Sequence, residues 1–214
     1  MRTENSPTPS VLKIGLTGSI GSGKSEAGRR LAERGACVID ADRVAHGTYA
    51  PGSEGFAALV REFGGGIVEA DGEIDRRRLA EIVFGDADRR RRLTEVVWPL
   101  TRRAVQDEMR RQEAAGTRVF VVEAALLVEA GWRDLVDQVW LVTAPADAVR
   151  KRLAGRGMAE GDIEARLAAA TDEAAAAAVA TVVLENDGDI ALLRRRVDDA
   201  WEAHVAPGLR GSGA

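Results

Sequence analysis

The sequence predicts a three-layer α/β/α domain built on a parallel five-stranded sheet. Short apolar runs of the kind found in strands covered on both faces alternate with longer segments of helical spacing. A glycine-rich turn joins the first of these strands to the first helix. No internal repeat is present that would indicate a solenoid instead.

The strands and helices of this sheet follow in order along the chain. The first strand is expected at residues 12–16, and the helix after the glycine-rich turn ends at Gly35. The expected helical segments that follow the later strands cover residues 147–180 and 190–204. The four further strands are expected at residues 36–39, 118–122, 137–143 and 181–184.

Residues 43–116 differ from the rest because they contain no convincing strand core apart from residues 67–68. They are expected to form a helical insertion. Asp75 can cap one helix that runs through Phe84, and Asp88 can cap another that reaches Trp98. Pro99 is expected to break or restart that pattern, because proline removes a helical hydrogen bond.

Composition limits the possible function. The 214 residues carry 30 Lys and Arg against 34 Asp and Glu, a net charge of −4, which disfavours a general nucleic-acid surface. Cys37 is the only cysteine, so no intramolecular disulfide or cysteine-based zinc cluster is expected. No apolar stretch has the length of a membrane span, and the first ten residues lack a signal-peptide core. We expect a cytoplasmic monomer without nucleic-acid or membrane partners.

The glycine-rich turn, residues 18–25 with the sequence GSIGSGKS, has the pattern of a phosphate-binding loop (P-loop). Its glycines let successive backbone N–H groups face phosphate oxygens at the start of a helix. Lys24 can reach the β- and γ-phosphates, and the Ser25 hydroxyl can bind Mg²⁺. We therefore expect ATP and Mg²⁺ as cofactors on a P-loop NTPase fold. The nucleotide-binding residues are expected to be Ser19, Ile20, Gly21, Ser22, Gly23, Lys24, Ser25 and Glu26.

Three acids lie where parallel strands are expected to end. Asp40 and Asp42 follow the second strand, and Glu123 follows the third, near the edge at which ligands bind in such sheets. Asp42 can serve as a catalytic acid–base group, although Asp40, Asp42 or both can instead cap the next helix. Ser25, Asp42 and Glu123 form the predicted metal set.

Cationic groups lie in two other places. Arg76 to Arg78 follow a turn and can either grip a phosphate or form a solvated helix face. Arg152 and Arg156 lie among glycines in a helical segment, as expected of a basic lid that closes over phosphates. A surface helix is the alternative for this segment.

These parts favour a small-molecule kinase over other P-loop proteins. A GTPase normally carries an Asn-Lys-x-Asp motif after a late strand, whereas this chain has Glu185-Asn186-Asp187-Gly188. A kinase needs a phosphate loop, an acid near the acceptor hydroxyl, an acceptor-binding region and a basic lid, and each has a candidate. A kinase for a different acceptor and a non-catalytic ATP-binding module remain the alternatives.

The order of several motifs resembles dephospho-coenzyme A kinases over residues 11–199. The matching strings are IGLTGSIGSGKS, VIDADRVAH, PGSEGFAALVREFG, DGEIDRRRLAEIVF, ALLVEAGW, KRLAGRG and LENDGD. The resemblance implies ATP-dependent phosphorylation of the ribose 3′-hydroxyl of dephospho-coenzyme A, the last step of coenzyme A synthesis.

The resemblance also implies roles for individual residues. Asp42, Lys24 and Arg152 are expected to be catalytic, with Asp42 as the general base, and Arg156 is expected to bind the nucleotide from the lid. The implied acceptor contacts are Asp42, Arg76, Arg77 and Leu126. The implied organisation is one domain over residues 11–208, with a core (11–42 and 117–205), an acceptor-binding insertion (43–116) and a lid (about 150–175). Residues 1–10 and 209–214 are expected to be flexible.

The chain departs from the family pattern at four places. Glu26 stands where the family usually has Thr, next to the expected phosphates. Trp98-Pro99 replaces a His-Pro pair, and Glu123-Ala124-Ala125 replaces an Asp-x-Pro. The glutamine and arginine usual in the lid helix are absent from residues 168–178.

Overall fold

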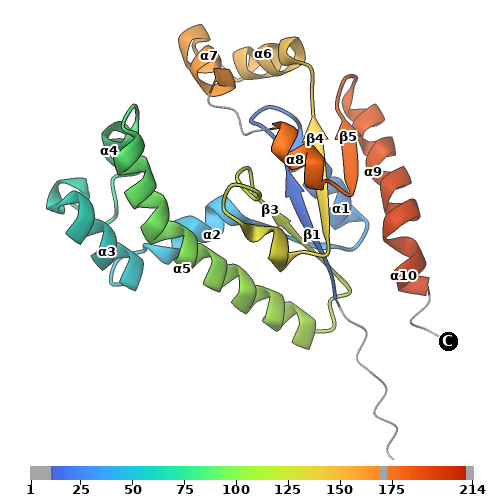
Figure 1. Cartoon of the computed structure of the whole chain (residues 1–214), viewed down its shortest axis with the longest axis horizontal. Helices are drawn as coiled ribbons and strands as arrows, with labels where there is room; N and C mark the ends of the chain where they lie inside the picture. Colours follow the sequence, from blue (N-terminus) through green and yellow to red (C-terminus); the bar gives the residue numbers. More distant parts are fainter. Residues whose placement is uncertain (1–10, 169–172, 211–214) are drawn as a thin grey trace, which may run out of the picture. The chain divides into compact units, whose positions relative to one another are not determined.

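A computed structural model describes residues 11–168 and 173–210 of the chain (Figure 1). The predicted leader 1–10, residues 211–214 of the predicted tail and residues 169–172 of the predicted lid lie outside the described residues. In the part that is described, no helix is long and apolar enough to cross a membrane. The described residues form two compact units: the first consists of those before residue 40 and after residue 109, and the second of residues 40–109.

The first unit contains the five-stranded sheet that the sequence predicts, and its strand order is β2-β3-β1-β4-β5. β1 pairs in parallel with both β3 and β4, and β4 pairs in parallel with β5. In this register Leu16 of β1 lies beside Glu123 of β3 and Trp140 of β4, so the three strands end at one edge. The strands are β1 (Leu12–Thr17), β2 (Cys37–Asp40), β3 (Val119–Glu123), β4 (Gln138–Thr143) and β5 (Val182–Glu185).

One face of this sheet is covered by the helix that follows the P-loop and by the C-terminal helices (Figure 1). These are α1 (Lys24–Glu33), α9 (Ile190–His204) and α10 (Ala206–Arg210). Trp140, predicted to be a core residue, is fully buried in this layer together with Ile14 and Leu31. Residues 209 and 210, which the sequence assigned to a flexible tail, belong to α10.

The opposite face is covered by the segment after β3 and by α8 (Glu173–Val179), which packs on β4. Gly15 of β1 is needed there, because a Cβ at this position would lie 2.5 Å from Cδ1 of Leu127. The segment includes the 3₁₀ helix η2 (Trp132–Leu135). Helices on both faces make the three layers that the sequence predicts.

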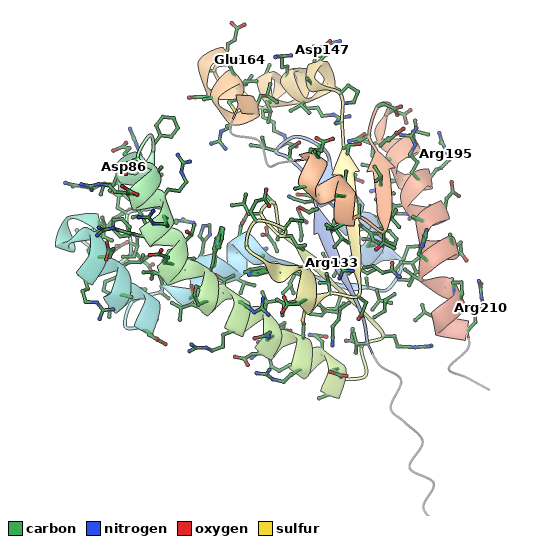
Figure 2. All side chains as sticks on the ribbon, viewed as in Figure 1. Asp86, Arg133, Asp147, Glu164, Arg195 and Arg210 are labelled. Atoms are coloured by element: carbon green, nitrogen blue, oxygen red, sulfur yellow. The ribbon has the colours of Figure 1, made fainter. Side chains whose placement is uncertain are left out.

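Two further helices follow β4 at its carboxyl end (Figure 1). They are α6 (Ala146–Gly155) and α7 (Glu160–Ala168), and they pack through Val149, Leu153 and Ile163. Figure 2 labels Asp147 on α6 and Glu164 on α7. Arg150 of α6 donates hydrogen bonds to both carboxylate oxygens of Glu164, at 2.7 and 3.3 Å, and so joins the two helices.

The second unit is helical, as predicted for the insertion. Its buried core is made by Leu59, Ile67, Ile74 and Leu79. Asp75 accepts a hydrogen bond from the backbone N–H of Arg78 and caps α4, as expected. Its helices are α2 (Ala41–Thr48), α3 (Glu54–Phe63), the 3₁₀ helix η1 (Gly65–Ile67), α4 (Arg76–Val83) and α5 (Ala87–Ala114), which continues into the first unit.

Two local expectations about this unit are wrong. The carboxylate of Asp86, rather than that of Asp88, accepts the hydrogen bond from the Arg89 backbone at the start of α5. Pro99 does not break α5, which continues for 28 residues. Apolar residues before Pro99 pack on the core of the unit, and Val105 and Met109 after it are buried, so packing outweighs the missing hydrogen bond.

Candidate active site

The P-loop connects β1 to α1, with Gly23 at the N-cap of the helix. Gly23 has φ 105°, a left-handed conformation that side chains other than glycine rarely adopt. A Cβ at this position would also lie 2.2 Å from Nδ2 of Asn186. The backbone can therefore turn tightly into the helix and present its first N–H groups to an anion, as the sequence predicts.

Three of the predicted site residues meet at the end of β3. Oε1 of Glu123 accepts hydrogen bonds from the Ser25 hydroxyl at 2.7 Å and from Nζ of Lys24 at 3.2 Å. The side chains of Lys24 and Glu123 are only 15% and 12% exposed. The carboxylate therefore holds the ammonium and the hydroxyl of the loop together at one point.

The donor set at this point fits Mg²⁺. Mg²⁺ prefers hard oxygen ligands and commonly takes one or two from the protein while phosphates and water supply the rest. Ser25 and Glu123 offer a hydroxyl and a carboxylate within hydrogen-bond distance of each other. No cluster of three or more His, Cys, Asp or Glu side chains suited to a metal occurs in the described residues.

The backbone of the loop is held from outside by Asn186, which the sequence analysis did not place in the site. Asn186 follows β5, is 6% exposed, and donates from Nδ2 to the Ser22 carbonyl at 2.6 Å. The sequence signal is its place in the string LENDGD, which follows a strand and is one of the strings that carry the family resemblance. Nearby, the guanidinium of Arg196 lowers the pKa of Asp187 by hydrogen bonding to its carboxylate.

Arg152 of α6 binds the same part of the loop. Its guanidinium donates to the carbonyl oxygens of Gly21 at 3.2 Å, Ser22 at 3.4 Å and Asn186 at 3.0 Å. Five N–H donors in a planar fork allow one arginine to reach several carbonyls in this way. In this structure Arg152 therefore connects α6, the P-loop and the end of β5.

The P-loop also contacts α6 and α7 through apolar side chains. Ile20 packs against the cluster of Val149, Leu153 and Ile163. The hydroxyl of Ser22 is buried and has no hydrogen-bond partner within the described part of the chain. The side chain of Ser22 therefore faces the protein interior.

A cavity of about 1070 Å³ lies over the loop. Its walls come from the P-loop, the first turns of α1, the end of α6 and the start of α9. It is large enough for a nucleotide, since small-molecule pockets commonly measure about 300 to 1,000 Å³. The predicted site residues that line it are Ser19, Ile20, Gly21, Gly23, Lys24, Ser25, Glu26, Arg152 and Arg156.

Glu26, the unexpected acid beside the loop, is paired with two arginines. One carboxylate oxygen accepts from Arg29 on the next turn of α1, and the other accepts from Nε of Arg194 on α9 at 2.7 Å. Its side chain is 13% exposed. The position at the first turn of α1 is also favourable for an acid, because the helix dipole is positive there.

The second unit and the segment after β3 contain the other predicted residues. Asp40 caps α2 by accepting from the backbone N–H groups of Asp42 and Arg43. Asp42 is therefore an exposed residue in the first turn of a helix, and of the two acids Asp40 is the one that caps it. The role of Asp42 as base or metal ligand stays a prediction.

The predicted acceptor contacts have different surroundings. Arg76 lies 3.2 Å from Nδ1 of His46, next to a pocket of about 510 Å³ that Tyr49 also lines. The guanidinium of Arg77 is 90% exposed and pairs with Glu81 one turn later at 3.1 Å. Leu126 follows β3 and is 45% exposed. Their contacts with an acceptor stay predictions.

A parallel sheet with a P-loop after its first strand and an acid on the neighbouring strand defines a P-loop nucleotide-binding protein. Comparison with known proteins identifies the family: the dephospho-CoA kinase model matches residues 12–191. The chain belongs to the dephospho-CoA kinase family.

Individual relatives agree with this assignment. A dephospho-CoA kinase of Symbiobacterium thermophilum is 41% identical, with 89% of this chain and 80% of the relative covered. One of Streptomyces avermitilis is 42% identical, covering 89% of this chain and 93% of the relative. Among solved structures, that of TT1252 from Thermus thermophilus has a TM-score of 0.78 at 34% identity and covers 91% of this chain and 98% of its own.

Proposed function

We propose that the chain transfers the γ-phosphoryl group of ATP to the ribose 3′-hydroxyl of dephospho-coenzyme A, releasing coenzyme A and ADP. This is the last step of coenzyme A biosynthesis. The observation that carries the proposal is the meeting of Lys24 and Ser25 at Glu123 beside the P-loop, in a chain that belongs to the dephospho-CoA kinase family.

In this reaction the bond between the γ-phosphorus and the bridging oxygen of ADP breaks, and a bond from phosphorus to the 3′-oxygen forms. Lys24 steadies the β- and γ-phosphates, and the loop N–H groups bind their oxygens. Asp42 accepts the proton of the 3′-hydroxyl. Because phosphoryl transfer has a loose transition state, alignment and charge neutralisation supply most of the acceleration, and proton removal comes late.

Ser25 and Glu123 are the residues of the first unit that would hold Mg²⁺, and Asp42 is the third member of the proposed set. When bound, Mg²⁺ would neutralise charge that develops on the phosphate oxygens. Lys24 can leave Glu123 and bind the phosphates when the nucleotide enters, because its ammonium is carried on a flexible side chain.

The basic lid is proposed to consist of residues of about 150–175. Arg152 contributes by ordering the loop through its three carbonyl contacts. Arg156 follows the end of α6, lines the nucleotide cavity and is exposed. Its guanidinium is therefore free to approach bound phosphates from the proposed lid. The proposed acceptor site is the insertion of residues 43–116, with Arg76, Arg77 and Leu126 as contacts. The monomeric state and cytoplasmic location stay predictions.

The proposal is tested by ADP formation from ATP, Mg²⁺ and a panel of acceptors. Dephospho-coenzyme A should support turnover, whereas coenzyme A, shikimate and free nucleosides should not. Turnover with another acceptor alone would favour a different small-molecule kinase. ATP binding without turnover on any acceptor would favour a non-catalytic module.

Two variants test the assigned roles. Asp42→Asn should lower kcat far more than it lowers ATP affinity, because the base acts on the acceptor. Lys24→Ala should lower both, because the ammonium contacts the nucleotide. The matched control is Asp199→Asn, an exposed acid on α9 that does not line the nucleotide cavity, which should leave kcat unchanged.

A further inference from the structure

The acid at position 26 raises a question about charge at the nucleotide cavity. ATP brings several negative charges to the P-loop, and an unpaired carboxylate that lines the same cavity would repel them. Glu26 lines the cavity but is not unpaired, because its two oxygens accept hydrogen bonds from Arg29 and Arg194. Where the family usually has a neutral threonine, this chain therefore has a carboxylate held between two guanidinium groups.

The two arginines differ in their exposure and in whether they line the cavity. Arg194 is 38% exposed, also pairs with Glu33 at 3.3 Å, and is not among the residues that line the cavity. Arg29 is 61% exposed and lines the cavity. Among the described residues its side-chain hydrogen bond goes to Glu26 through Nη1, which leaves further N–H donors of the guanidinium for a ligand.

We propose that Arg29 is a nucleotide-binding residue that contacts the α-phosphate of ATP, and that Glu26 is a positioning residue that holds Arg29 for this contact. The proposal deepens the proposed kinase function and rests on it. Lys24 and Ser25 at the start of α1 serve the β- and γ-phosphates and the metal. Arg29 lies one turn after Ser25 on the same helix and lines the cavity, so the α-phosphate is the phosphate left for it.

Glu26 is suited to the positioning role because a carboxylate and a guanidinium form a strong, directional pair. The i,i+3 spacing on α1 places the two side chains on the same face of the helix. Arg194 meanwhile balances the charge of Glu26 from α9. Arg29 can therefore bind a phosphate without leaving an uncompensated carboxylate behind it.

The experiment measures the affinity of the full chain for ATP, ADP, AMP and adenosine in the presence of EDTA, by competition against a fluorescent ATP analogue. Arg29→Ala should lower the affinities for ATP, ADP and AMP by about tenfold each, which is the usual effect of losing a charged hydrogen bond. Adenosine, which has no phosphate, should bind as before. In steady-state assays KM for ATP should rise while kcat and KM for dephospho-coenzyme A stay unchanged.

Glu26→Ala distinguishes the positioning role from simple repulsion. It should lower the affinity for ATP about threefold, since the hydrogen bond that orders Arg29 contributes less binding free energy than the direct contact. In an Arg29→Ala background the same change should weaken binding no further. Arg29→Lys, which keeps the charge without the fork, should fall between the wild type and Arg29→Ala.

The matched control is Arg195→Ala, because Arg195 is exposed on α9 and does not line the cavity (Figure 2). It should leave all four affinities unchanged, and thermal unfolding should show that every variant is folded. Equal affinities for wild type and Arg29→Ala, loss of adenosine binding, or tighter ATP binding by Glu26→Ala would each overturn the inference alone. Failure of the wild type to bind ATP would overturn the proposed function as well.

Discussion

The hydroxyl of Ser25 donates a 2.7 Å hydrogen bond to Oε1 of Glu123, across 98 positions of the sequence. Lys24 donates to the same oxygen. The acid at the end of β3 thus organises the start of α1, and it stands in a segment, Glu123-Ala124-Ala125, that departs from the family pattern. Glutamate in place of aspartate adds one methylene, which extends the carboxylate towards the loop.

Replacing Glu123 with glutamine should show whether this carboxylate serves the metal. The half-saturating Mg²⁺ concentration should rise by about tenfold to a hundredfold, the usual range when a group that supports a metal is changed. Initial rates at fixed ATP and increasing Mg²⁺ measure it. Glu129→Gln, an exposed glutamate in the same segment, is the control. An unchanged Mg²⁺ dependence would remove Glu123 from the metal site.

Asn186→Ala should destabilise the fold and the loop together. The change deletes a buried donor to the Ser22 carbonyl, which should cost about 1–3 kcal/mol of unfolding free energy. Urea unfolding measures this cost. Asn186→Asp has the same size but lacks the donor, so it should be at least as destabilising and should also weaken ATP. Full stability of the aspartate variant would show that the hydrogen bond contributes nothing.

Arg152→Lys tests whether the arginine acts by bridging. A lysine keeps the charge but cannot reach the carbonyls of Gly21, Ser22 and Asn186 together, because its three donors sit on one nitrogen. We expect kcat/KM for ATP to fall at least about tenfold in both Arg152→Lys and Arg152→Ala, given the usual strength of charged hydrogen bonds. Arg195→Lys, on the exposed surface of α9, is the control. Near-normal activity of Arg152→Lys would indicate that charge alone matters.

The ion pair of Arg150 and Glu164 predicts that the stability of the folded state depends on pH. Hydrogen bonding to Arg150 lowers the pKa of Glu164 below its ordinary value of 4.5. A lowered carboxylate pKa stabilises the folded state above pH 4.5, and this stabilisation is lost as pH falls through the lowered value.

The test compares thermal unfolding of wild type and Glu164→Gln between pH 7 and pH 3. Because both side chains are about half exposed, the difference in Tm at pH 7 should be small, about 2 °C. This difference in Tm should shrink towards zero as the pH approaches 3. A difference that stays constant across this range would mean that the charge of Glu164 is not its source.

Much of the site was predictable because it depends on local chemistry. The P-loop pattern requires particular residues at adjacent positions, so Lys24 and Ser25 could be assigned without knowing the fold. Glu123 followed from a second rule, since acids at the ends of neighbouring parallel strands meet at one edge. The sheet was predictable for the same reason, because each strand is a separate apolar run.

The rest depends on contacts that local patterns do not contain. Asn186 binds Ser22 across 164 positions, and Glu26 binds Arg194 across 168. Pro99 was misjudged because the packing that keeps α5 continuous comes from other helices of its unit. Asp40 and Asp42 were ambiguous because an acid after a strand can be a helix cap or a reactive group, and the backbone decides between them.

The position of α9 has a consequence for synthesis of the chain on the ribosome. This helix supplies one wall of the nucleotide cavity through Ile190 and Leu193, and it is joined to α1 by Arg194 and by the pair of Asp198 with Arg30. Because a chain is made from its N-terminal side onwards, the P-loop leaves the ribosome well before α9, and its cavity lacks one wall until α9 has emerged. We therefore expect ATP to stabilise a nascent chain fully only after residues 190–204 have emerged.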